Sequence, residues 1–182
     1  MFARKVIGIL GLTLFVLPFV SLADGRPISQ HAGSSAAVSN LLLQARNDAI
    51  QLQKDAEELR SFNWERMSWE SHAMKLDQIR DEVNSLGLLV TMLNEQRTKA
   101  SPQDQQVIDR VTPMLKELAA KVQVAIEDLK NNPEHIQTFG YRDDYLAIAE
   151  ISSKLAAQIS DVVQYDQTNA KLEKLARRLE IS

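Results

Sequence analysis

The chain has 182 residues and no cysteine, and its 21 basic and 24 acidic side chains give a net charge of −3. The lack of cysteine excludes disulfides, thiolate metal sites, covalently attached haem and cysteine nucleophiles. Nucleic-acid binding normally needs a basic surface. Because the lysines and arginines of this chain are interleaved with acids, we expect no nucleic-acid partner.

Residues 1–23 have the three-part pattern of a secretory signal peptide. A basic pair at positions 4 and 5 precedes an apolar stretch from Val6 to Val20, and small residues end at Ala23. The apolar stretch, about fifteen residues interrupted by Pro18, is short for a membrane span, which takes roughly twenty. We therefore expect cleavage near Ala23 and an exported protein, periplasmic or secreted. An uncleaved N-terminal anchor is the alternative.

Residues 24–34 are rich in glycine, proline and serine and lack any apolar periodicity, which predicts a flexible lead-in. Residues 35–182 have the length of one ordinary domain, enough to bury a core without disulfides. Once the basic pair of the leader is removed, nineteen basic side chains face twenty-four acidic ones. We expect no membrane span in this mature chain.

Apolar residues from position 38 onwards recur at alternating spacings of four and three. The repeat forms three stripes, at Val38, Leu42, Ala45, Ala49, Leu52, Ala56 and Leu59; at Trp69, His72, Leu76, Ile79, Val83, Leu86, Val90 and Leu93; and at Ile108, Val111, Leu115, Leu118, Val122, Ala125 and Leu129. Such a repeat keeps one apolar stripe on one face of a helix, as in a coiled coil. Because alternation of period two is nearly absent, we expect an all-α fold.

Local signals place the ends of the first three helices. Ser34 or Ser35 can cap the first helix. Serines and an asparagine between Ser61 and Ser71 favour a break before the second, although one helix of about sixty-five residues is the alternative. Ser101-Pro102 begins the third helix and Asn131-Asn132-Pro133 ends it. The third stripe runs through Pro113 without a change of phase, which predicts a kink and no break.

The fourth helix is expected to open at Asp143 and Asp144, after a loop that contains Gly140. Its stripe runs to Val162 and resumes only at Leu172, which predicts a stammer and a last stretch that overhangs the other helices. Short loops between helices favour antiparallel neighbours. The expected fold is an antiparallel up-down-up-down four-helix bundle with a long fourth helix.

In such a bundle the first and third loops lie at the same end, which gathers most of the aromatic residues there. These loops carry the candidate binding surface, which comprises Trp64, Trp69, His72, His135, Phe139, Tyr141 and Tyr145. One interpretation is an aromatic plug that closes the end of the bundle. The other is a recognition surface, because exposed tryptophan and tyrosine often anchor binding.

His72 occupies a core position of the second stripe, where a histidine is usually hydrogen-bonded and structural. A functional interpretation pairs it with His135 as a metal site, or with Met67 or Met114 as axial haem ligands. Motifs of hydrolases, calcium loops and phosphate-binding loops are absent from the sequence. We therefore predict no catalytic residues, no cofactor and no enzyme activity. Gly87 is interpreted as a point of close helix approach.

The segment Ser68–Ala73, with the helix that follows it to Leu93, resembles exported, all-helical bacterial proteins. The resemblance implies bacterial export and a helical fold, and it supplies no activity or ligand residues. We predict a non-enzymatic interaction module that binds a protein or another component of the cell envelope. A metal- or haem-binding bundle and a structural, self-associating protein, that is, a homo-oligomer, are the alternatives.

Overall fold

The computed structural model describes residues 34–65 and 67–180, with the side chains of 63–65 and Glu180 left out. The expected signal peptide, and the lead-in up to residue 33, lie outside this part of the chain. Within it the secondary structure is entirely helical, as the apolar periodicity predicted. The elements are α1 (Ala36–Glu65), α2 (Trp69–Glu95), the 3-10 helix η1 (Arg97–Lys99), α3 (Pro102–Asn131), the 3-10 helix η2 (Pro133–Gln137) and α4 (Phe139–Glu180).

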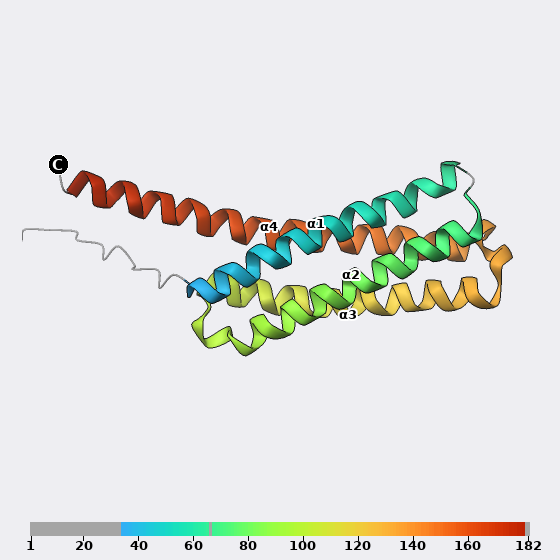
Figure 1. The fold of residues 1–182 in the computed structure, drawn as a ribbon, viewed down its shortest axis with the longest axis horizontal. Coiled ribbons are helices and arrows are strands. Elements are labelled where there is room, and N and C mark those ends of the chain that lie inside the picture. Colours follow the sequence, from blue (N-terminus) through green and yellow to red (C-terminus); the bar gives the residue numbers. More distant parts are fainter. Residues whose placement is uncertain (1–33, 66, 181–182) are drawn as a thin grey trace, which may run out of the picture. The chain divides into compact units, whose positions relative to one another are not determined.

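The four α-helices pack as a bundle (Figure 1). α1 packs mainly against α2 and α4, and α3 packs mainly against the same two helices. No helix in the described ranges is both long enough and apolar enough to cross a membrane.

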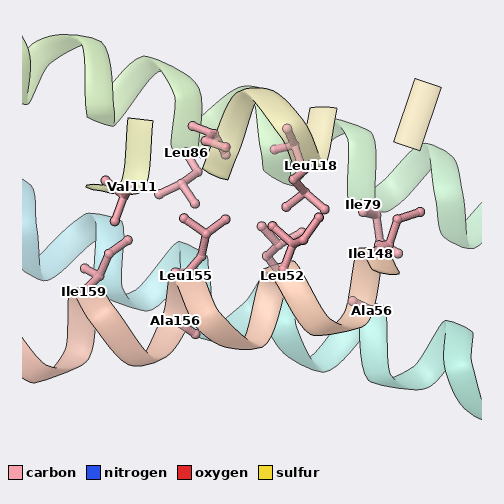
Figure 2. Packing of buried hydrophobic residues seen from close by; sticks show 14 of the residues in the cluster. Leu52, Ala56, Ile79, Leu86, Val111, Leu118, Ile148, Leu155, Ala156 and Ile159 are labelled. Atoms are coloured by element: carbon pink, nitrogen blue, oxygen red, sulfur yellow. The ribbon is translucent and has the colours of Figure 1, made fainter. Parts of the chain in front are cut away.

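The predicted stripes form the core. All their residues are buried except Trp69, at the first position of α2. Figure 2 shows Leu52, Leu86, Leu118 and Leu155, one from each α-helix, pointing into the same interior. Each is essentially inaccessible to solvent. Burial of these stripes is the dominant favourable contribution to the stability of the bundle, because each fully buried leucine contributes about 1.5–3 kcal/mol.

Serine caps mark the starts of the first three helices. The hydroxyl oxygen of Ser35 accepts from the amide of Val38 at 3.4 Å, and Ser68 accepts from the amide of Ser71 at 3.4 Å. Ser101 accepts from the amide of Asp104 at 3.2 Å. The cap at Ser68 separates α1 from α2, so the single long helix is wrong. α3 runs through Pro113 without a break.

The predicted start of the fourth helix is wrong by one turn. α4 begins at Phe139, and Gly140 lies in its first turn and not in a loop. The reason is a cap that the sequence reading passed over: the hydroxyl oxygen of Thr138 accepts from the amide of Tyr141 at 3.3 Å.

Gly87 does not mark a close helix approach. A β-carbon at this position would meet only the Leu115 Cδ2 atom within 4 Å, at an ordinary contact distance of 3.9 Å. Gly87 instead lies along an open groove of about 460 Å³ between α2 and α3, with Leu88 and Leu115 among the lining residues.

Candidate binding surfaces

Four rings from three helices form an aromatic cluster at one end of the bundle: Phe62 of α1, His72 of α2, and Tyr141 and Tyr145 of α4. The His72 ring lies edge-on to Phe62 at 5.3 Å between centroids and to Tyr141 at 5.5 Å. Tyr141 contacts Tyr145 in the same manner at 5.6 Å. All four residues are buried, so the cluster fills the space between the helices.

A hydrogen bond at the centre of this cluster joins α2 to α4. His72 Nδ1 and the Tyr141 hydroxyl lie 3.0 Å apart. Burial lowers the pKa of His72 and raises the pKa of Tyr141, so both side chains are neutral near neutral pH. A metal or haem ligand at His72 Nδ1 would have to replace this bond. The geometry supports the structural interpretation of His72.

The remaining candidate residues are not part of this cluster. Trp69 is 39% exposed and Phe139 is 79% exposed, at the first positions of α2 and α4. His135 in η2 is engaged with Asp128, at 2.8 Å between Nδ1 and Oδ1. The side chain of Trp64, in the last turn of α1, lies outside the described part of the chain.

No grouping of three or more histidine, aspartate and glutamate side chains suited to a metal ion occurs among the described residues. His72 and His135 each have a different hydrogen-bond partner, Tyr141 and Asp128. The histidine pair that the sequence suggested therefore has no further histidine, aspartate or glutamate placed with it as a metal ligand in the described ranges.

The second candidate surface is the end of α4, where Lys171–Leu179 forms nine consecutive exposed residues, called here the overhang. Figure 1 shows this end of α4 continuing past the start of α1. Three leucines of the overhang are exposed to solvent: Leu172 by 58%, Leu175 by 52% and Leu179 by 76%. Their spacing of three and four places them on one face of the helix. The predicted overhang is thus present.

The charge of this end differs from that of the bundle. Residues 171–180 carry four basic and two acidic side chains, whereas residues 34–170 carry fourteen basic and twenty-one acidic ones. One ion pair is internal to the overhang, at 3.5 Å between Arg177 and Glu173. The overhang is therefore a basic, amphipathic end on an acidic bundle.

Two carboxylate pairs between neighbouring helices were missed by the sequence reading. The first joins Asp55 of α1 to Glu82 of α2, beside Lys75, whose Nζ donates to Asp55 Oδ1 at 2.9 Å. Burial and the adjacent Asp55 raise the pKa of Glu82 to about 8. Although burial opposes it, hydrogen bonds with Glu82 and Lys75 lower the pKa of Asp55. Burial and the neighbouring carboxylate thus favour the protonated form of Glu82 at neutral pH.

The second pair joins Asp104 of α3 to Asp166 of α4. Asp104 is fully buried, and the Ser34 hydroxyl donates to its Oδ2 atom. Burial and the negative charge of Asp104 raise the pKa of Asp166 to about 6. Asp104 Oδ1 has no other hydrogen-bond partner, so a proton on Asp166 would satisfy it.

Only weak sequence signals could have found these pairs. Asp55 and Glu82 each stand one position before a stripe residue, where a charged side chain is usually solvated. Asp104 stands in the first turn of its helix, where an acid is common because it lies near the positive helix end.

Comparison with known protein families, curated proteins and solved structures gives no match for this chain.

Proposed function

We propose that the protein is an exported, non-enzymatic binding module of the cell envelope, and that the overhang of α4 is its contact surface. The observation that carries the proposal is the run of nine exposed residues with three exposed leucines. Leucines on a free helix face are unfavourable in water unless something covers them. Export rests on the leader pattern of residues 1–23.

The aromatic cluster is the less suitable surface. Its four rings are buried against one another, and the hydrogen bond between His72 and Tyr141 occupies the His72 Nδ1 atom and the tyrosine hydroxyl. Among the side chains that the structure describes, Trp69 and Phe139 are exposed aromatics at the helix starts near it, and they stand on different helices. This arrangement favours the aromatic plug and leaves the overhang as the surface available for binding.

The proposal includes an antiparallel up-down-up-down order of the helices. The short connections at η1 and η2, and the contacts of α1 with both α2 and α4, support this order. It has a consequence for function, since it leaves the C-terminal turns of α4 without a neighbouring helix.

A site-specific cross-link tests the contact surface. A photoactivatable amino acid replaces Leu175 in cells that export the protein, and an identical replacement of Leu88 provides the control. Leu88 is 69% exposed but lies on the bundle. We expect an adduct, with protein or with lipid, from position 175 and none from position 88. Equal labelling at the two positions, or no adduct at 175, would remove the overhang as the contact surface.

A further inference from the structure

The proposed function leaves the partner of the overhang open, and its chemistry can be inferred from charge and area. We propose that the overhang docks on an anionic lipid surface, with its leucines in the interface and its lysines near the headgroups. This inference rests on the proposed function, because it names what covers the leucines of Lys171–Leu179.

The leucines do not continue the face that α4 turns toward the bundle. At 3.6 residues per turn, Leu172 is rotated by about 80° from Val162 and by about 140° from Ile159, which are both buried. The apolar face of the overhang therefore points in a different direction from the face that α4 buries in the bundle. A flat surface can reach that face without displacing any of the helices.

The polar side of the overhang is basic. Lys171 and Lys174 follow one edge of the leucine face onto the back of the helix, and Arg177 extends this surface. Glu173 and Glu180 are the acids of this segment, and Glu173 is already paired with Arg177. A basic amphipathic helix of this kind is typical of attachment to an anionic membrane surface.

A second copy of the chain fits the overhang less well. Antiparallel pairing of two leucine faces would bury only three leucines from each copy. Specific protein interfaces also take roughly 20–30 residues from each side, and the overhang supplies nine. A lipid surface needs no complementary shape, because attachment scales with apolar area and charge.

Vesicle binding of the chain that begins at Asp24 tests the inference, because the apolar leader would itself partition into lipid. The probes are vesicles of phosphatidylglycerol and phosphatidylcholine in equal parts, and vesicles of phosphatidylcholine alone. We expect binding to the anionic vesicles that weakens with added salt, since exposed charges are screened. Binding to the neutral vesicles should be at least about tenfold weaker.

Two sets of variants test whether the overhang is responsible for vesicle binding. Joint replacement of Leu172, Leu175 and Leu179 by serine should abolish it, whereas Met74→Ser with Leu88→Ser and Val124→Ser should not. The control residues are exposed to a comparable extent on the bundle. Lys171→Glu with Lys174→Glu should weaken binding by about tenfold or more, and the exposed pair Lys116→Glu with Lys130→Glu should have a smaller effect.

The outcomes separate this inference from the proposed function. If neither vesicle binds while position 175 still cross-links to a protein, the partner is a protein and the lipid inference is overturned. A concentration-dependent dimer that the serine variant abolishes would likewise overturn it in favour of a second copy. Vesicle binding that the overhang variants leave unchanged overturns it too. If vesicles do not bind and position 175 gives no adduct, the proposed function falls as well.

Discussion

At the scale of single residues, three polar pairs join the helices of the bundle. His72 and Tyr141 link α2 to α4, Asp55 and Glu82 link α1 to α2, and Asp104 and Asp166 link α3 to α4. An apolar stripe fixes which face of a helix is buried, but it leaves freedom to slide along a neighbour. Such pairs select one register, because a slipped helix would leave buried polar groups without partners.

Removal of the Tyr141 hydroxyl tests the first of these pairs. Tyr141→Phe leaves the buried His72 Nδ1 atom without its partner, which should lower the free energy of unfolding by about 1–3 kcal/mol. Urea unfolding measures the change, and Tyr165→Phe, at a residue that is 41% exposed, is the matched control. Adding His72→Phe to Tyr141→Phe should recover part of the loss, because it removes the unsatisfied group. A double variant whose losses simply add would argue against coupling through this bond.

The raised pKa of Glu82 predicts a pH dependence of stability. Its folded value of about 8 exceeds the ordinary 4.5, so the folded state binds more protons and stability falls as pH rises through this window. The lowered pKa of His72 makes stability rise with pH, but only below pH 6.5. The raised pKa of Asp166 makes stability fall with pH, but only up to about pH 6. Between about pH 6.5 and about pH 8, deprotonation of Glu82 should therefore account for the decrease in the free energy of unfolding. We expect this decrease to be roughly 1 kcal/mol after solvent screening.

Chemical unfolding across this pH range measures the effect. Glu82→Gln should flatten the profile, whereas Glu95→Gln, at an exposed position, should leave it unchanged. Stability that rises with pH above 6.5 in the parent protein would show that Glu82 is not protonated in the fold.

At the scale of elements, the helices followed from the sequence far better than the polar pairs did. The 4-3 repeat located the stripes of α1, α2 and α3, and of their residues only Trp69, at a helix start, is exposed. The start of α4 was misplaced because Thr138 is a weaker cap signal than the acids at Asp143 and Asp144. Each carboxylate pair forms where a position beside the stripe of one helix meets such a position on another helix. Which positions meet depends on how the two helices are aligned along their length, and the apolar period of a single helix does not specify this alignment.

Pro113 is a residue that disfavours the helix in which it lies. It lies inside the continuous α3, where proline removes one backbone donor and disfavours the helix by about 3 kcal/mol relative to alanine. Because the residue is exposed, Pro113→Ala should raise the free energy of unfolding by about 1–3 kcal/mol. Pro102→Ala should give no such gain, since proline is favoured at the first helical position. An unchanged unfolding midpoint for Pro113→Ala would mean that the helix tolerates this proline without a loss of stability.

At the scale of the whole molecule, the described chain has two parts. The bundle is held together by its buried core, and the overhang contributes no residue to that core. α4 has 42 residues, against 27 to 30 for the other three α-helices, and its excess length projects at one end. The stripe of α4 lapses after Val162, and no described residue of α4 beyond Val163 is buried. The leucines that follow lie outside the core, and binding is the role that we propose for them.

Leucine truncation at the two places should separate these roles. Leu118→Ala, in the core, should lower the free energy of unfolding by about 2–5 kcal/mol. Leu172→Ala, at a residue that is 58% exposed, should change it by less than about 0.5 kcal/mol. Thermal or urea unfolding of the two variants checks the contrast. Comparable losses at the two positions would place the overhang within the folding unit.

Amide hydrogen exchange, measured with and without anionic vesicles, tests most directly whether the overhang is free to bind. A helical segment this short without tertiary packing frays, so the amides of Lys171–Leu179 should exchange much faster than those near Leu155. On vesicles that contain phosphatidylglycerol they should become protected, while the bundle amides stay as they were. Overhang amides that are already as protected as the bundle in the isolated protein would contradict the account, because the leucines would then have a partner within the molecule or in a second copy.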